Sequence, residues 1–206
     1  MNRRVGVLVS GRGSNLQALI DAIQDGQLEA TIAVVISNRR DAPALDRARR
    51  AGIETLTLDH RTFASRADHD LAIVRELRTW NVGLVCLAGY MRLVGAPLLD
   101  AYPNAILNIH PSLLPAFPGV NAQRQALEHG VQVSGVTVHF VTAALDDGPI
   151  IIQRAVPVYA DDTEETVAAR ILDEEHRAYP EAVATVLNGG WRIEGRRFLP
   201  RTSARG

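Results

Sequence analysis

The stretch "RVGVLVSGRGSNLQALIDAIQDG", residues 4–26, contains in succession a continuous apolar run, a glycine loop and an amphipathic segment. A continuous apolar run is typical of a strand that is covered on both faces, as in a parallel sheet. Four apolar residues of the amphipathic segment share one helical face: Leu16, Leu19, Ile20 and Ile23. Gly26 is placed to serve as the C-cap of that helix. The stretch therefore predicts the first strand–loop–helix unit of an α/β fold.

The alternation of strand and helix continues through the first half of the chain. Apolar runs predict strands at 31–37, 54–58 and 82–90, and amphipathic segments predict helices at 42–52 and 65–80, the second with Ser65 as N-cap. This order predicts a doubly wound, mostly parallel sheet with right-handed crossovers. Such sheets bind ligands at the carboxyl ends of their strands, which here means the loops 11–15 and 89–94 and the segment after 108–110.

The second half of the chain has a different pattern. Two longer apolar segments, 133–141 and 148–158, predict an antiparallel ribbon, and residues 191–200 predict a small terminal hairpin. Between them a helix follows Asp162, with Glu165 completing a capping-box pattern. Pro180 is expected to kink or divide this helix. The predicted fold class is thus α/β, with a mostly parallel, Rossmann-like sheet and a C-terminal antiparallel extension.

Length and composition indicate one soluble domain over residues 1–206, with 47% hydrophobic residues and a formal net charge of −1. We therefore expect neither nucleic acid nor a membrane as a partner. The short apolar run near the N-terminus predicts a strand rather than a secretory signal, and the single Cys86 fits the cytoplasm. All 22 basic residues are arginines, which excludes Schiff-base chemistry and a P-loop lysine.

The glycine loop "SGRGSN", residues 10–15, directly precedes the first helix. Exposed backbone amides at a helix start favour an anion, and Ser14 could add a hydroxyl. A dinucleotide-binding loop would have a third glycine at position 16, where this chain has leucine, so a phosphomonoester fits better. The alternative interpretation is a plain strand-to-helix turn.

The segment "LNIHPSLLPAFPG", residues 107–119, places Asn108 and His110 two positions apart at the end of an apolar strand. Alternate side chains of a strand share a face, and Pro111 keeps His110 extended. An amide donor beside an imidazole is what acyl transfer requires, because one stabilises an oxyanion and the other carries protons. Structural hydrogen bonds at a strand end are the alternative.

Two acidic positions could complete this site. A carboxylate from "LDDGP", residues 145–149, would stabilise the imidazolium of His110 if the loop came near it, although such sequences are also ordinary turns. Glu175 lies in an apolar stripe of the last helix with Val167, Ile171 and Tyr179. There it lies either at the rim of the helix interface or in a pocket, where it could hold a substrate amine. His139 could line the same site as His110, and no grouping has metal-site spacing, so we expect no metal.

Four segments together resemble the glycinamide ribonucleotide formyltransferase family: "SGRGSNLQALID", "LAGYMRLV", "LNIHPSLLPAFPG" and "GVTVHFVTAALDDGPIIIQ". The resemblance extends from Val5 to about Trp191. It implies formyl transfer from 10-formyltetrahydrofolate to the amine of 5'-phosphoribosylglycinamide in purine biosynthesis. It also implies small-molecule partners only, no metal, and a monomer or homodimer. Residues 1–100 would form the phosphate- and nucleotide-binding half, and residues 101–200 the folate-binding and catalytic half.

The resemblance assigns roles to individual positions. The catalytic residues would be Asn108, His110 and Asp146, with Asp146 rather than Asp147 as the partner of the histidine. The residues matching substrate-binding positions are Gly13, Ser14, Asn15 and Glu175. Those matching folate contacts are Arg66, Met91, Arg92, Leu93, Val94 and Asn108. The chain departs from the family at Ala116, where a lysine is common, and in "GVNAQRQAL", which lacks histidines of some relatives. These departures could alter substrate affinity.

Three other functions are less favoured by the sequence. Formyltetrahydrofolate hydrolases usually carry an additional N-terminal regulatory domain, whereas the first predicted strand begins within five residues of Met1. Methionyl-tRNA formyltransferases usually carry a C-terminal RNA-binding barrel, for which this chain ends too soon and has no basic excess. A non-catalytic folate- or nucleotide-binding protein would not need Asn108, His110 and Asp146 together.

Overall fold

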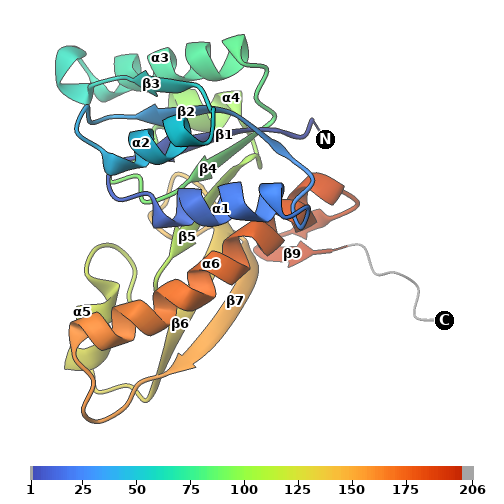
Figure 1. Cartoon of the computed structure of the whole chain (residues 1–206). Helices are drawn as coiled ribbons and strands as arrows, with labels where there is room; N and C mark the ends of the chain where they lie inside the picture. The colour runs from blue at the N-terminus through green and yellow to red at the C-terminus, as the bar shows by residue number, and fades with distance from the viewer. Residues whose placement is uncertain (1, 201–206) are drawn as a thin grey trace.

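The computed structural model describes residues 2–200, which form one mixed sheet flanked by helices (Figure 1). The strands are β1 Arg4–Val9, β2 Thr31–Ser37, β3 Thr55–Thr57, β4 Leu84–Leu87, β5 Ile106–His110, β6 Val133–Phe140, β7 Ile150–Pro157, β8 Arg192–Glu194 and β9 Arg197–Leu199. The helices are α1 Ser14–Gln24, α2 Pro43–Arg50, α3 Arg66–Thr79, α4 Ala96–Ala101, α5 Ala122–Glu128 and α6 Glu164–Asn188, with a 3₁₀ turn η1 at His60–Thr62.

The strand order is β3-β2-β1-β4-β5-β6-β7-β9-β8. The first five strands in this order pair in parallel, β5 pairs with β6 and β6 with β7 antiparallel, and β8 and β9 form an antiparallel hairpin. The order reverses at β1, from which the chain proceeds first to β2 and β3 and later to β4 and β5. The predicted α/β class, with a mostly parallel sheet and a C-terminal antiparallel extension, is confirmed.

The helices cover the sheet in two groups. α1 packs against α2 and α6, whereas α3 packs against α4. Figure 1 shows α1 and α6 lying side by side across the sheet. Every residue of β1 after Arg4 is buried, which accounts for the continuous apolar run in its sequence.

A left-handed glycine sets the start of α1. Gly13 is the N-cap residue and has φ 75°, a conformation that side chains disfavour. A Cβ at this position would also lie 2.5 Å from the Cβ of Ala44 in α2. The loop after β1 can therefore pass close to α2 only because residue 13 is glycine, and this passage points the first amides of α1 toward the carboxyl edge of the sheet.

Helix α6 differs from its prediction in two respects. It runs unbroken from Glu164 to Asn188 with Pro180 inside it, so the expected division is wrong. Buried residues lie on both sides of the proline, and their packing on the sheet outweighs the loss of one backbone hydrogen bond. The N-cap is Thr163, and the capping box uses the hydroxyl of Thr166 instead of Glu165. By contrast, Ser65 caps α3 as predicted, accepting a hydrogen bond from the amide of Asp68.

Several element boundaries also differ. The helices α4 and α5 were not predicted, because each is short and follows a loop rich in glycine or proline. The strand predicted at 82–90 is limited to Leu84–Leu87, since the residues after it turn away as a loop at the sheet edge. Helix α1 ends at Gln24, and Gly26 follows in the left-handed region one residue after the C-cap Asp25.

A buried hydroxyl ties α6 to the centre of the sheet. Tyr179 donates to the carbonyl of Leu87 at 2.9 Å and lies 3.3 Å from the carbonyl of Leu107. Leu87 is the last residue of β4 and Leu107 lies within β5, the neighbouring parallel strand, and such buried hydrogen bonds stabilise and orient the groups they join. Tyr179 therefore sets the position of Glu175, one helical turn earlier, relative to Asn108, the residue after Leu107.

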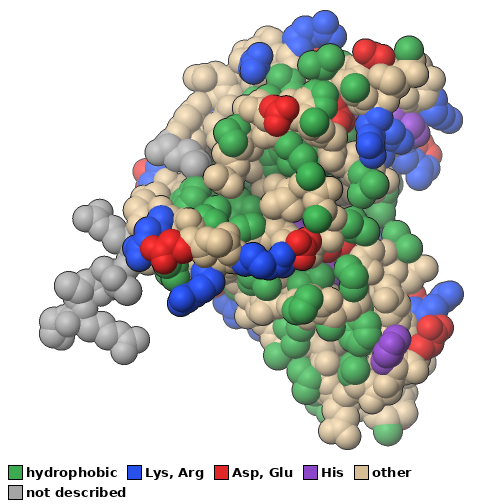
Figure 2. All heavy atoms as spheres, turned by 180° about the vertical axis from the view of Figure 1, so that it is seen from behind, with side chains coloured by type: hydrophobic (Ala, Val, Ile, Leu, Met, Phe, Trp, Pro, Cys, Tyr) green, Lys and Arg blue, Asp and Glu red, His purple; other side chains and the backbone are tan. Residues whose placement is uncertain are grey.

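The surface carries charges of both signs. Figure 2 shows acidic and basic side chains interspersed on one face of the molecule, with hydrophobic side chains between them. No helix within residues 2–200 is both long enough and apolar enough to cross a bilayer.

Candidate active site

Strand β5 carries Asn108 and His110 to the carboxyl edge of the sheet. Its antiparallel partner β6 places His139 opposite Asn108 and Thr137 opposite His110. His110 is 4% exposed and His139 is 2% exposed, so both imidazoles lie at the base of the site. The alternation along β6, which puts residues 137 and 139 on one face, is the sequence signal that also indicates Thr137 as part of this cluster.

Both ring nitrogens of His110 face oxygen acceptors. Nδ1 lies 3.4 Å from Oδ2 of Asp146, and Nε2 lies 2.8 Å from the backbone carbonyl of Phe117. Only a doubly protonated imidazole can donate to both groups at once. The surroundings of His110 therefore accommodate an imidazolium, which is the form that can deliver a proton.

Asp146 reaches His110 from the loop between β6 and β7. Its backbone is left-handed, with φ 49°, a conformation that aspartate tolerates better than most residues. Oδ2 accepts a hydrogen bond from the amide of Gly119 at 2.8 Å, and Oδ1 lies 3.8 Å from Nε2 of His139. Asp147 instead points outward and pairs with Arg196. The structure thus brings Asp146, and not Asp147, to the imidazole.

His139 orients the carboxamide of Asn108. Its Nδ1 lies 2.8 Å from the carbonyl of Phe140, so this nitrogen carries the proton, and Nε2 is left to accept from Nδ2 of Asn108 at 3.2 Å. Burial is the largest influence on His139 and lowers its pKa, which agrees with this neutral tautomer. The NH₂ group of Asn108 is therefore held in the cluster as a donor, and it retains a second hydrogen for a ligand.

The loop after β5 is held by a buried hydroxyl. Thr137 donates to the carbonyl of Ser112 at 2.7 Å and accepts from the amide of Leu114 at 3.0 Å. Gln153 of β7 adds a bond to Thr137 at 3.0 Å and one to the carbonyl of Leu114 at 2.8 Å. These contacts join positions 16 to 39 residues apart, and no local pattern indicates them.

A second polar cluster lies at the start of α1. Nδ2 of Asn15 donates to Oε2 of Glu175 at 2.7 Å, whereas Oδ1 of Asn15 has no hydrogen-bond partner within residues 2–200. Glu175 is 8% exposed, so its carboxylate is buried and does not lie at an exposed rim. Burial raises the pKa of Glu175, although the Asn15 bond and the charge of Arg12 oppose it.

Replacing Glu175 by glutamine is expected to stabilise the ligand-free protein at pH 8. Because the folded state binds the Glu175 proton more tightly than the unfolded state, stability is greatest below the ordinary carboxyl pKa and is lost as pH rises through the raised pKa. Glutamine cannot ionise and can still accept from Asn15. Thermal unfolding should show Glu175→Gln melting above the unchanged protein at pH 8, with the difference shrinking toward pH 4. Glu128→Gln, an exposed change on α5, should show no such trend.

The predicted folate contacts lie at the end of β4, beside β5. The amide of Met91 donates to Oγ of Ser10 at 2.9 Å, while the Met91 side chain is 74% exposed. Leu93 is also exposed, and Arg92 and Val94 are partly buried. Arg66 is the first residue of α3 and approaches Gly95, where a Cβ would lie 3.8 Å from its Nε. Exposed apolar side chains therefore lie on the loop that follows β4, the strand next to β5.

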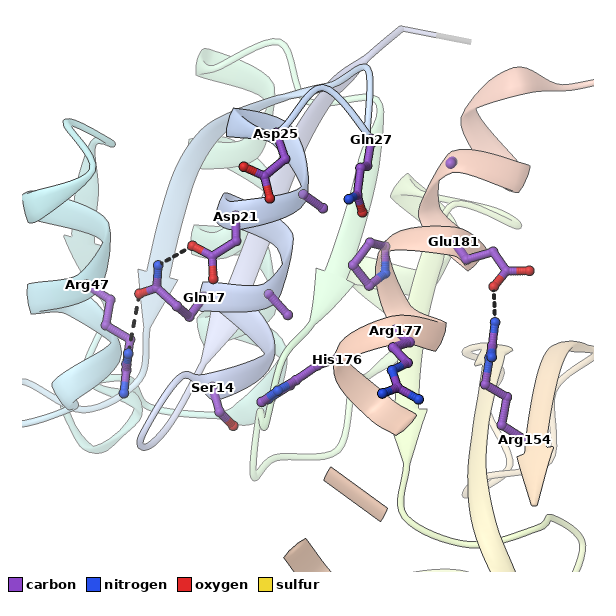
Figure 3. A pocket seen from close by; sticks show the side chains of 14 residues that line it. Ser14, Gln17, Asp21, Asp25, Gln27, Arg47, Arg154, His176, Arg177 and Glu181 are labelled. Carbon is purple, nitrogen blue, oxygen red and sulfur yellow. Dashed lines mark hydrogen bonds and ion pairs between the residues drawn. The ribbon is translucent and has the colours of Figure 1, made fainter. Parts of the chain in front are cut away.

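A cavity of about 680 Å³ lies between α1 and α6 (Figure 3). Ser14 lines one end of it, and His176 projects from α6 toward α1 in the same view. Asn108, His110 and Asp146 do not line this cavity, so the cavity is separate from their cluster. Across residues 2–200, the structure holds no group of three or more histidine, cysteine or acidic side chains arranged to bind a metal ion.

At the carboxyl edge of this doubly wound sheet, a carboxamide, an imidazole and a carboxylate lie within reach of one another. This arrangement is typical of enzymes of the acyl-transfer class. Comparison with known proteins narrows this class. The family model described as formyl transferase matches residues 3–183. The trifunctional purine biosynthetic protein adenosine-3 of Drosophila melanogaster is 48% identical over 189 residues, 91% of this chain and 14% of that protein.

Two bacterial proteins match along nearly their whole length. The phosphoribosylglycinamide formyltransferase of Escherichia coli (strain K12) is 43% identical over 203 residues, covering 95% of each chain. The crystal structure of glycinamide ribonucleotide transformylase 1 from Symbiobacterium toebii is 58% identical with a TM-score of 0.95, covering 97% of this chain and 94% of that one. The chain belongs to the formyl transferase family, and its resemblance to the glycinamide ribonucleotide formyltransferases is confirmed.

Proposed function

We propose that this enzyme transfers the formyl group of 10-formyltetrahydrofolate to the amine of 5'-phosphoribosylglycinamide in de novo purine biosynthesis. The observation that carries the proposal is the cluster of Asn108, His110 and Asp146, in which an oriented amide donor lies beside an imidazole held by a carboxylate. Similarity to bacterial proteins named for this reaction over nearly the whole chain supports it.

The substrate amine attacks the formyl carbon, and the carbonyl oxygen becomes an oxyanion that accepts from Nδ2 of Asn108 and from protonated His110. The bond from the formyl carbon to N10 then breaks as N10 receives a proton, and the attacking nitrogen loses one. Asp146 holds the imidazole and stabilises its charged form. His110 must exchange the carbonyl of Phe117 for the substrate oxygen, so the loop at 111–119 has to yield when substrate binds.

The remaining site residues position the two substrates. Gly13, Ser14 and Asn15 would bind the ribonucleotide phosphate at the start of α1, where the helix dipole favours an anion. The buried carboxylate of Glu175 would contact the sugar or glycinamide part, one turn from Tyr179. Folate would contact Asn108, Arg66 and the segment 91–94, with the rim of exposed apolar side chains against its rings.

The proposal includes the wider setting of the reaction. Residues 1–100 act as the phosphate- and nucleotide-binding half and residues 101–200 as the folate-binding and catalytic half of one domain. The enzyme works in the cytoplasm as a monomer or homodimer, and its partners are small molecules, without nucleic acid, a membrane or a metal.

The test is to mix the purified protein with 10-formyltetrahydrofolate, with and without glycinamide ribonucleotide, and to follow the release of tetrahydrofolate. Release that requires the nucleotide, with formylated nucleotide as product, is the expected result. Release without the nucleotide would identify a formyltetrahydrofolate hydrolase instead, and folate binding without any release would identify a non-catalytic binding protein.

A further inference from the structure

The segment 91–95, which carries most of the proposed folate contacts, is held at both ends by side chains from other parts of the chain. The amide of Met91 donates to Oγ of Ser10 at 2.9 Å, and the amide of Gly95 donates to Oδ2 of Asp70 at 2.8 Å. Ser10 is 3% exposed and Asp70 is 2% exposed, whereas Met91 is 74% exposed. The backbone of the segment is therefore fixed at its ends by buried groups, while an apolar side chain on it stays in contact with solvent.

Asp70 is a buried carboxylate to which the proposed reaction gives no role. It lies on α3 one helical turn after Arg66, so the two side chains share a helix face. Its hydrogen-bond partner Gly95 is the N-cap residue of α4, so the bond joins α3 to α4 at the point where the segment 91–95 ends. Burying a carboxylate is costly unless it is hydrogen-bonded, and the Gly95 amide offsets part of that cost.

The backbone of Gly95 lies so close to Asp70 that no side chain fits between them. A Cβ on Gly95 would lie 2.6 Å from Oδ2 of Asp70 and 3.8 Å from Nε of Arg66. Gly95 has φ −98°, which any residue can adopt, so the nearby carboxylate, and not the backbone conformation, requires glycine at this position. The carboxylate, the glycine backbone and the arginine thus lie together beside the proposed folate contacts.

The charge of Asp70 lies near two of the cationic side chains proposed to contact folate. Burial raises the pKa of Asp70, and the hydrogen bond from Gly95 opposes this effect, as do the positive charges of Arg66 and Arg92. Asp70 is therefore placed to fix the backbone of the segment and to lie beside its arginines without itself contacting the ligand.

We propose that Asp70 is a positioning residue of the folate site, whose carboxylate holds the Gly95 end of the segment 91–95 in the conformation that receives the formyl folate. The inference rests on the proposed function, because it assigns a supporting group to the proposed folate contacts. A segment that is fixed before the ligand arrives loses less conformational entropy on binding. Without the Asp70 bond, folate would have to order the segment, so its affinity would fall while the chemical step stayed the same.

Asp70→Ala is expected to raise the KM for 10-formyltetrahydrofolate by about ten-fold, the order of effect of one hydrogen bond to a charged acceptor. The turnover number and the KM for glycinamide ribonucleotide should each change by less than about two-fold, because the bond contributes equally before and during formyl transfer. Asp70→Asn keeps an oxygen that can accept from the Gly95 amide, so its folate KM should stay within about three-fold of that of the unchanged enzyme. Steady-state kinetics and calorimetric titration with the folate measure these effects.

Gly95→Ala tests the same contact from the other partner. The added methyl group would displace the carboxylate of Asp70 and should raise the folate KM by a similar factor. In an Asp70→Ala protein the methyl group has space, so the double variant should have the same folate KM as Asp70→Ala alone. Two unrelated defects would instead multiply.

Two controls separate positioning from a general loss of stability. Asp68→Ala removes an exposed carboxylate from α3, two residues before Asp70, and should leave the folate KM unchanged. Thr163→Ala removes the N-cap of α6 and should lower the melting temperature without raising the folate KM. Thermal unfolding of each variant gives the stability against which the kinetic change is compared.

Three results would overturn the inference: an unchanged folate KM in Asp70→Ala, an equal rise in KM for both substrates, or a rise that Asp70→Asn does not reduce. If Asp70→Ala does not fold, Gly95→Ala decides the question by the same comparison of the two KM values. A failure of the proposed function looks different, since the unchanged protein would then form no formylated nucleotide. Calorimetric titration with 10-formyltetrahydrofolate would still test Asp70 in that case, and a protein that binds no folate would exclude both proposals.

Discussion

His110→Ala is expected to lower kcat for formyl transfer by about 10²–10³-fold, because it removes both a proton carrier and a donor to the oxyanion. Both ring nitrogens already face acceptors, Asp146 and the carbonyl of Phe117, so the position of the imidazole is set before substrate binds. KM for either substrate should change little, since neither binds mainly through this ring. Steady-state kinetics with saturating nucleotide measures the effect.

Stability has to be followed in the same variant. His110 is buried, and its removal leaves the carbonyl of Phe117 with only the long contact from Oγ of Ser112 at 3.4 Å, which costs about 1–3 kcal/mol of unfolding free energy. Thermal unfolding should therefore show a lower but cooperative transition. His129→Ala is the matched control, since this histidine is exposed on the turn after α5 and should leave kcat unchanged. Near-normal turnover in His110→Ala would remove His110 from the mechanism.

Asn108→Ala is expected to lower kcat by about 10²–10³-fold, which is the usual effect of losing one oxyanion donor. The amide of Asn108 is oriented by His139 at 3.2 Å, so its donor geometry exists before substrate arrives. An interaction formed only in the transition state lowers kcat and kcat/KM by similar factors, and that pattern is expected here. Asn188→Ala, at the exposed end of α6, is the control for the same side-chain change.

The double variant Asn108→Ala/His110→Ala separates a shared role from two independent ones. If both groups act on the same oxyanion, the double variant should lose less than the product of the two single effects, as is usual for residues that act as a unit. A loss equal to that product would mean that the two side chains act at different steps. If Asn108→Ala left kcat unchanged and raised only the KM for folate, Asn108 would be a folate contact without a role in the transition state.

Much of the fold follows from local patterns in the sequence. Continuous apolar runs mark the strands that are buried on both faces, and the 3.6-residue spacing marks α1 and α3, with Ser65 as the N-cap of α3. These signals depend on residues within one or two turns of each other, so they can be recognised without knowledge of the rest of the chain. The short helices α4 and α5 carry no such signal, and the undivided α6 depends on packing that reaches beyond the proline.

The candidate site shows the same division. The sequence by itself placed Asn108 and His110 on one strand face, because side chains alternate with a period of two. The family resemblance favoured Asp146 over Asp147, but only the tertiary structure brought Asp146 to His110, paired Asn15 with Glu175 across 160 residues, and set His139 as the group that orients Asn108. The physical reason is that the local backbone decides to which face of a strand a side chain points. The distance between side chains far apart in the sequence depends instead on how every strand and helix packs around the shared core.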